Sequence, residues 1–160
     1  MATLTRLTNA VPTLVLHSPA HHLMSGRYAV LEFTGRRTGR MFRTPVAYVQ
    51  DGSRVLLSTD STWWRNLVDR PTVRLRLRGR VVHGTARVVG DEVEAVGILG
   101  ELVRRVPGYA RPAGLVATRG EVSVLELERA VTDGRRSIEI QLHGFFPGRA
   151  VSDTAVRPAP

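Results

Sequence analysis

The segment TGRRTGRMFRTPV, residues 34–46, combines four arginines with two glycines between two apolar runs. A guanidinium group is permanently charged and binds a phosphate or carboxylate through two parallel hydrogen bonds. Glycine tolerates positive φ angles, so Gly35 and Gly39 can turn the chain and expose its backbone N–H groups to the same anion. The segment is therefore a candidate anion site, although a solvated hairpin loop explains the same composition equally well.

A second candidate follows in the sequence, where Trp63 and Trp64 precede Arg65 and Asn66. Neighbouring residues on a helix point about 100° apart, so one indole can pack inward while the other borders a pocket. An indole wall beside the Asn66 amide, which offers both a donor and an acceptor, suits a flat heterocycle. Ordinary core packing of the two tryptophans is the simpler explanation, so the sequence leaves both interpretations open.

Motifs for hydrolysis and for metal chemistry are missing from the sequence. It has no GxSxG, P-loop or HExxH pattern and no cysteine. His17, His21 and His22 lie close together, but no nearby carboxylate completes a metal site. Glu126 and Glu128 share one face of a predicted strand, where exposure to solvent is the simplest explanation. Nothing in these residues supports hydrolysis.

The chain has 160 residues and a formal charge of +9, with 23 basic residues against 14 acidic ones. All the basic residues are arginine, which favours a polyanionic ligand or partner. We expect one domain over residues 1–150, with an N-terminal helical segment at 1–27 and a disordered tail at 151–160. No segment resembles a signal peptide core or a membrane span, so we expect a cytoplasmic protein.

Alternation of apolar and polar residues predicts strands along most of the chain. The predicted strands are 28–33, 44–50, 54–59, 72–79, 80–89, 122–128 and 137–142, and the predicted helices are 4–25, 61–71 and 91–106. Asp51-Gly52 and Asp133-Gly134 indicate hairpin turns, and Pro45 indicates an edge strand or a bulge. Hairpin-linked strands with two or three helices favour an antiparallel barrel of the mainly-β α+β class over a parallel doubly wound sheet.

Two stretches together resemble a known family. TGRRTGRMFRTPVAYVQDGSRVLL, followed by TWWRNLVDRPTVRLRLRGR and GTARVV, is similar to the deazaflavin-dependent nitroreductases of actinobacteria over residues 28–110. The resemblance implies a split β-barrel of the FMN-binding type, a homodimer, and coenzyme F-420 as the cofactor.

Family site residues carry over where the motifs match. The resemblance implies that the cofactor's phosphate and acidic tail contact the loop and the strand after it, at Arg37, Thr38, Gly39, Arg40, Arg43, Thr44 and Pro45. It places Ser58, Thr59, Trp63, Trp64 and Asn66 around the deazaflavin ring, and Tyr109 beside the substrate as a candidate proton donor. Three features depart from the family pattern: a shortened DSTWW loop, Phe42 where a basic residue is common, and a predicted extra hairpin at 122–142.

The expected activity is hydride transfer between the deazaflavin and an electrophilic organic substrate, such as a quinone, enone, imine or nitro compound. One alternative keeps the fold but binds FMN, haem or no cofactor. Another is a nucleic-acid-binding module, suggested by the charge of +9 and by Arg74, Arg76 and Arg78 on one strand face. A solvated barrel exterior is the simpler explanation of that face. Against the nucleic-acid alternative, aromatic residues are only 6% of the chain, and the sequence has no recognition helix or known nucleic-acid motif.

Overall fold

Seven antiparallel strands form one sheet in the computed structural model, which describes residues 26–144. The order across the sheet is β2-β1-β5-β6-β7-β4-β3. The strands are β1 (Tyr28–Thr34), β2 (Met41–Ala47), β3 (Val49–Asp51), β4 (Arg54–Thr59), β5 (Thr72–Leu77), β6 (Arg80–Val88) and β7 (Arg136–Leu142). The helix predicted at 4–25 and the tail predicted at 151–160 lie outside the described residues.

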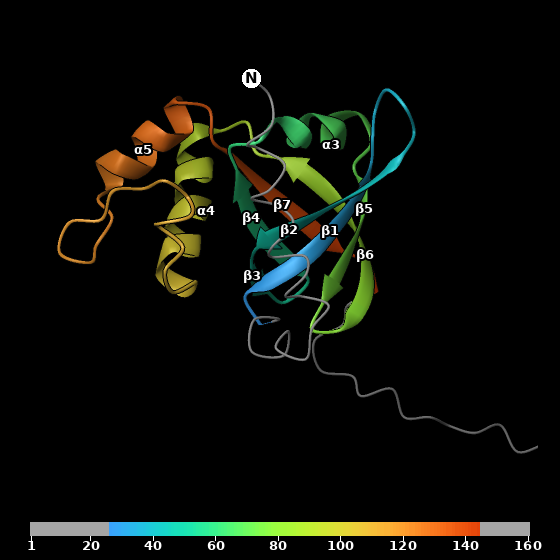
Figure 1. The fold of residues 1–160 in the computed structure, drawn as a ribbon, viewed down its shortest axis with the longest axis horizontal. Helices are drawn as coiled ribbons and strands as arrows, with labels where there is room; N and C mark the ends of the chain where they lie inside the picture. Colours follow the sequence, from blue (N-terminus) through green and yellow to red (C-terminus); the bar gives the residue numbers. More distant parts are fainter. Residues whose placement is uncertain (1–25, 145–160) are drawn as a thin grey trace, which may run out of the picture.

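The sheet curls into an open barrel, in which β7 passes behind β1 in the view of Figure 1. Its two edge strands, β2 and β3, follow each other in the sequence, and the chain moves from one edge to the other at the buried Tyr48. Pro45 lies in β2, where a missing N–H group costs no ladder hydrogen bond on the open side. The predicted antiparallel barrel and the predicted edge position of Pro45 are both confirmed.

The inside of the barrel is filled by apolar side chains from every strand except β3. Leu31, Leu75 and Ile138 are fully buried there, and Trp63 and Trp64 pack against the same cluster. A second apolar cluster lies between the outer face of β3 and β4 and the helices beside them. Burial on both faces explains why β4 reads as a nearly continuous apolar run.

A 3₁₀ turn and three helices accompany the strands within residues 26–144: η1 (Thr62–Trp64), α3 (Arg65–Asp69), α4 (Glu92–Arg105) and α5 (Val124–Thr132). Asp91 caps α4, since its Oδ1 accepts a hydrogen bond from the Glu94 N–H at 2.8 Å. Figure 1 shows α4 and α5 packed together on one side of the barrel, whereas α3 lies at one end of it. The helix predicted at 91–106 is confirmed.

The strand predicted at 122–128 is wrong, because this segment begins helix α5. Ser123 caps the helix by accepting a hydrogen bond from the Glu126 N–H at 3.2 Å. Leu127 and Val131, four residues apart, are the side chains that α5 buries, while Val124 is 63% exposed. The predicted hairpin at 122–142 is therefore also wrong: Asp133-Gly134 links α5 to β7, and β7 pairs with β4 and β6. Glu126 and Glu128 lie on the helix.

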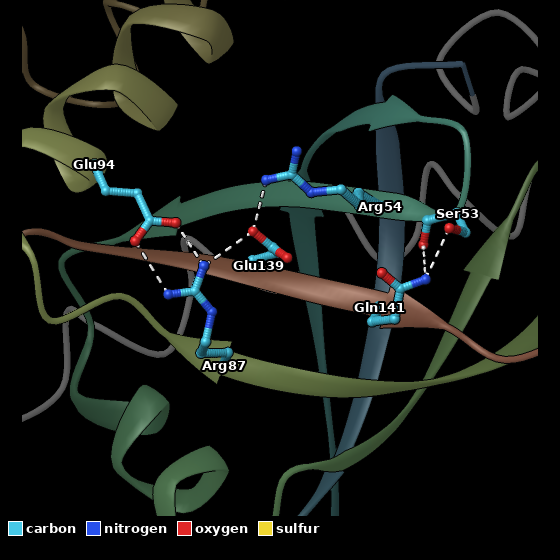
Figure 2. A network of polar contacts seen from close by, with 6 residues as sticks. All are labelled: Ser53, Arg54, Arg87, Glu94, Glu139 and Gln141. Atoms are coloured by element: carbon cyan, nitrogen blue, oxygen red, sulfur yellow. Dashed lines mark hydrogen bonds and ion pairs between the residues drawn. The ribbon is translucent and has the colours of Figure 1, made fainter.

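Charged side chains tie β4, β7 and β6 to α4 on the outer face of the sheet (Figure 2). Glu139, on β7, accepts hydrogen bonds from Arg54 at 2.7 Å and from Arg87 at 3.1 Å, and Arg87 also holds Glu94 on α4. The hydrogen bond from Arg54 and the neighbouring Arg87 lower the pKa of Glu139. This network links three strands of the sheet to α4.

The arginine-rich face of β5 is partly neutralised. Arg74 lies 3.5 Å from Glu32 on the neighbouring β1, and Arg43 on β2 contacts the same carboxylate at 3.0 Å. Glu32 is only 5% exposed, whereas Arg76 is exposed to solvent. This row across β2, β1 and β5 gives Arg74 and Arg43 an intramolecular partner, which weakens the argument for a nucleic-acid surface.

Candidate cofactor and substrate site

Two adjoining cavities lie beside the segment from β4 to α3; the β1–β2 loop borders the first, and β2 borders the second. The first, which we call the arginine cavity, has a volume of about 480 Å³. Its walls are Phe33, Gly35, Arg36, Arg37, Thr38, Phe42, Thr62, Trp63, Arg65 and Asn66. The second, the tyrosine cavity, has a volume of about 450 Å³. Its walls are Tyr28, Thr44, Pro45, Val46, Ala47, Ser58, Thr59, Asp60, Ser61, Trp63, Tyr109, Pro112, Ala113 and Arg135. Trp63 lines both cavities.

The β1–β2 loop is held in shape by its own backbone and by Asn66. The Gly35 N–H donates to the Arg40 carbonyl at 2.8 Å, and the Gly39 N–H donates to the Gly35 carbonyl at 2.9 Å. Gly39 has φ +67°, a conformation that side chains disfavour. From across the cavity, Asn66 Oδ1 accepts the Arg36 N–H at 3.0 Å, and Asn66 Nδ2 donates to the Trp63 carbonyl at 2.9 Å. One amide therefore fixes the loop against the tryptophan turn.

Positive charge accumulates in the arginine cavity. Arg36, Arg37 and Arg65 line it together, and the described residues in its walls include no acidic side chain. Arg36 has a distant partner, Asp69 at 3.8 Å, whereas the guanidinium of Arg65 lies 5.6 Å from the Trp64 ring centre. Three guanidinium groups with so little compensating charge favour an anionic ligand.

One wall of the arginine cavity is a stack of three aromatic rings. The Phe33 ring stacks on the Phe42 ring, with ring centres 5.8 Å apart and an angle of 19° between the planes. It also stacks on the Trp63 ring, with ring centres 5.3 Å apart and an angle of 24° between the planes. A Cβ atom on Gly35 would come within 2.5 Å of the Phe42 ring, so the stack depends on glycine at that position. Phe42, a departure from the family pattern, thus extends the flat wall that begins with Trp63.

The tyrosine cavity contains a buried hydroxyl that has no hydrogen-bond partner. Tyr109 is 5% exposed, and its Oη is among the unpartnered buried polar atoms of the described residues. Burial raises the pKa of this phenol, and the neighbouring Arg135 guanidinium opposes that shift. A phenol in this position is protonated at neutral pH and has a proton to donate to a ligand.

Arg135 is a residue of this site that sequence reasoning missed. Its guanidinium is buried, and it donates to the Ala113 carbonyl at 2.7 Å, to Asp60 at 3.3 Å and to Ser58 at 3.4 Å. In the sequence it follows Asp133-Gly134, which indicated an exposed hairpin turn. Because β7 pairs with β4 in the register Ser58 opposite Ser137, the start of β7 lies beside the end of β4. No local pattern signals that pairing.

The structure divides the residues named by the resemblance into four groups. Arg37, Thr38 and Asn66 line the arginine cavity, Trp63 lines both cavities, and Thr44, Pro45, Ser58, Thr59 and Tyr109 line the tyrosine cavity. The remaining four, Gly39, Arg40, Arg43 and Trp64, are in the wall of neither.

These four residues have structural contacts of their own. Gly39 and Arg40 close the loop, and Arg43 binds the buried Glu32. Trp64 packs on the barrel interior, with the guanidinium of Arg136 5.7 Å from its ring centre. Their contribution to ligand binding would therefore be indirect.

The sequence profile described as F420H(2)-dependent quinone reductase matches residues 12–128, which is more than half of the chain. The chain belongs to this quinone reductase family. It is a deazaflavin-dependent oxidoreductase whose cofactor is coenzyme F-420, and it transfers hydride between that cofactor and an electrophilic organic substrate. The resemblance noted in the sequence is confirmed.

Solved structures with the same fold are distant in sequence. One is a Clostridium acetobutylicum protein related to general stress protein 26 of the pyridoxinephosphate oxidase family (TM-score 0.52, 13% identity, 81% of this chain and 84% of that chain). Another is HutZ, the haem storage protein from Vibrio cholerae (TM-score 0.50, 13% identity, 79% of this chain and 89% of that chain). A third is described as a domain-swapped dimer (TM-score 0.52, 16% identity, 72% of this chain and 80% of that chain). They show that the fold is a split barrel.

The residues of the two cavities fit a deazaflavin cofactor. The arginine cavity offers guanidinium groups for a phosphate and an acidic tail, and Trp63 continues its flat wall into the tyrosine cavity. The unpartnered Tyr109 hydroxyl is a polar group that can form a hydrogen bond with a ligand. Within residues 26–144, no cluster of metal-ligating side chains is found, and no helix is long and apolar enough to cross a membrane.

Proposed function

We propose that the two cavities form one reductase site, in which the arginine cavity holds the anionic tail of coenzyme F-420 and the tyrosine cavity holds the ring and the substrate. The observation that carries this proposal is the junction at Trp63, which has three guanidinium groups on one side and an unpartnered hydroxyl on the other. When bound, the reduced cofactor supplies a hydride. The substrates proposed are quinones, which have carbonyl oxygens that can accept a proton.

The protein's own residues bind, orient and exclude water. Arg36 and Arg37 bind the anionic groups, since each guanidinium offers a two-point contact to phosphate or carboxylate. Trp63 supports one face of the ring by stacking. Pro45 and Ala47 give the tyrosine cavity an apolar side that limits access of water to the reacting atoms. Tyr109 holds a proton for the substrate oxygen.

A homodimer and a cytoplasmic location also belong to this proposal. The support for a dimer is the neighbour described as a domain-swapped dimer. Light scattering coupled to size-exclusion chromatography measures the mass in solution. A mass near 17.6 kDa would contradict the dimer, because that is the mass of one chain.

A fluorescence titration with coenzyme F-420 tests the arginine cavity. Arg37→Ala removes one charged hydrogen-bonding group, and charged hydrogen bonds are worth about 1.5–3 kcal/mol, so the Kd should rise about 10- to 100-fold. Arg104→Ala is the matched control, since Arg104 is an exposed arginine on α4 that contacts Glu101. Equal affinity of wild type and Arg37→Ala would exclude the loop from the site.

Parallel titrations distinguish the alternative cofactors. FMN and haemin are titrated under the same conditions, with flavin fluorescence and the haem absorption band as the signals. Tight binding of either one without measurable binding of coenzyme F-420 would contradict the proposed site. A gel shift with duplex DNA tests the nucleic-acid alternative, which predicts binding that persists at moderate salt.

A further inference from the structure

The loop between α4 and α5 holds Tyr109 in a fixed position on the outer face of the sheet. The Tyr109 N–H donates to the Val106 carbonyl at 3.1 Å, and the Tyr109 carbonyl accepts the Ala113 N–H at 3.1 Å. These two turns direct a large side chain inward, where its ring packs with the second apolar cluster. Its hydroxyl nevertheless has no partner, although an unsatisfied buried hydroxyl destabilises a folded protein. A phenylalanine would fill the same space without that cost.

Arg135 lines the same cavity as Tyr109. Its guanidinium joins three segments: Ser58 at the end of β4, Asp60 just beyond it, and Ala113 in the loop that carries Tyr109. Asp60 is the acidic residue at this end of the cavity, and its side chain is 76% exposed, so it compensates the buried guanidinium only in part. The positive charge of Arg135 is therefore the buried one of the pair, and it acts on the Tyr109 phenol more strongly than the exposed Asp60 does.

The charged and titratable groups around Tyr109 act in opposite directions. Arg135 favours the tyrosinate, and Asp60, which lies beyond it, disfavours it. Tyr28 is the other phenol in the wall of this cavity. Burial disfavours the tyrosinate most strongly, so Arg135 makes the buried phenol a better acid than it would otherwise be.

We propose that Arg135 is a positioning residue for the reductase reaction: it fixes the loop that carries Tyr109 by binding the Ala113 carbonyl, and it places its charge in the cavity where the Tyr109 hydroxyl donates its proton to a carbonyl oxygen of a quinone. This inference rests on the proposed function. The residue lies beyond the part of the chain that the family profile matches, 12–128. Tyr109 is the catalytic residue in this account, because it touches the substrate, while Arg135 acts through it.

The step balances in atoms and electrons. The quinone receives a hydride, which brings two electrons and one proton, from the reduced cofactor. The oxygen anion that results takes the second proton as the Tyr109 O–H bond breaks, and the product is a hydroquinone. Arg135 stabilises the tyrosinate left behind, because its charge is already in place where the negative charge develops. Water at the cavity mouth then returns a proton to Tyr109.

Kinetics with menadione, a simple naphthoquinone, test the pair. Tyr109→Phe and Arg135→Gln should each lower kcat about 10- to 100-fold, because the proton transfer they impair is a general acid step. The Kd for coenzyme F-420 should stay within about twofold of the wild-type value. The double variant should be no slower than Tyr109→Phe alone, since Arg135 acts through that hydroxyl. Arg136→Gln is the matched control, because it removes the adjacent arginine, which is outside the tyrosine cavity.

A tyrosinate absorbance titration of the protein without cofactor provides a readout independent of activity. The component that is lost in Tyr109→Phe should move to higher pH in Arg135→Gln and stay in place in Arg136→Gln. If Arg135→Gln does not fold, Arg135→Lys, which keeps the charge with fewer donors, should leave the titration near that of wild type and lower kcat by a smaller factor. Tyr109→Phe should melt no lower than wild type, since it loses only an unpartnered hydroxyl.

Three outcomes would overturn the inference: wild-type kcat in Tyr109→Phe, additive losses in the double variant, or an unchanged tyrosinate titration in Arg135→Gln. Failure of the proposed function looks different. In that case wild type does not bind coenzyme F-420, while the titration of the protein alone still reports whether Arg135 and Tyr109 are coupled.

Discussion

Asn66 offers a sharp test of how the arginine cavity is built. The structure gives its amide two contacts within the protein, one with the Arg36 N–H and one with the Trp63 carbonyl. We therefore expect Asn66 to act on the cofactor through the position of the loop. The perturbation is Asn66→Ala, which removes both hydrogen bonds and leaves the surrounding backbone in place.

The magnitude follows from these two bonds. A typical hydrogen bond contributes about 0.5–1.5 kcal/mol to stability, so the two together contribute about 1–3 kcal/mol. Asn66 is only partly buried, so water can replace part of this, and we expect a loss near 1 kcal/mol. Release of the loop also lowers the affinity for coenzyme F-420 by about tenfold, since ordering the loop then costs about 1.4 kcal/mol at the moment of binding.

Three measurements check the Asn66 prediction. Urea unfolding gives the stability change, a fluorescence titration gives the affinity, and hydrogen exchange at the Arg36 amide reports the order of the loop without any ligand. Exchange at that amide should become faster in Asn66→Ala. Gln50→Ala is the control, because Gln50 makes one comparable side-chain hydrogen bond, to the Gly52 carbonyl at 3.0 Å, and lies in neither cavity.

The result that refutes this reasoning is specific. If Asn66→Ala weakens cofactor binding but leaves exchange at the Arg36 amide unchanged, the side chain acts by direct contact with the cofactor. If neither quantity changes, Asn66 contributes nothing to the site.

Two further predictions concern the barrel. Gly84→Ala should lower the free energy of unfolding in urea by about 1–3 kcal/mol, because its Cβ would come within 2.6 Å of the Ile140 side chain. Gly97→Ala is the control, since the space around Gly97 is open and no loss is expected. A Gly84→Ala variant as stable as wild type would contradict the packing. Glu139→Gln should destabilise the protein at neutral pH, because the network of Figure 2 lowers the pKa of Glu139 and its charge stabilises the fold. The difference in the free energy of unfolding between the variant and wild type should shrink as the pH falls through and below 4.5, the ordinary glutamate pKa, since protonation removes that charge. A difference that stays constant with pH would show that the charge of Glu139 contributes nothing.

Local patterns in the sequence determined most of the barrel. The Asp51-Gly52 turn, the alternating β5 and the capped α4 depend on neighbours close in the chain, and they lie where the sequence predicts them. The arginine loop was identified for the same reason, since its charges and glycines are contiguous. The strand predicted at 122–128 was wrong because its alternating residues belong to a helix. Ser123 caps that helix, and packing against α4 decides which of its side chains are buried.

Only the tertiary structure brought the second half of the site together. Ser58, Tyr109 and Arg135 come from three distant segments, and they meet because β7 pairs with β4 while Arg135 binds the Ala113 carbonyl in the loop after α4. Strand pairing over such a separation is set by the apolar faces that the whole sheet buries, which no short stretch of sequence records. The sequence by itself thus determined the charged loop and the strands that flank it. The buried guanidinium beside an unpartnered phenol was decided by the pairing of β7 with β4 and by the packing of the loop after α4.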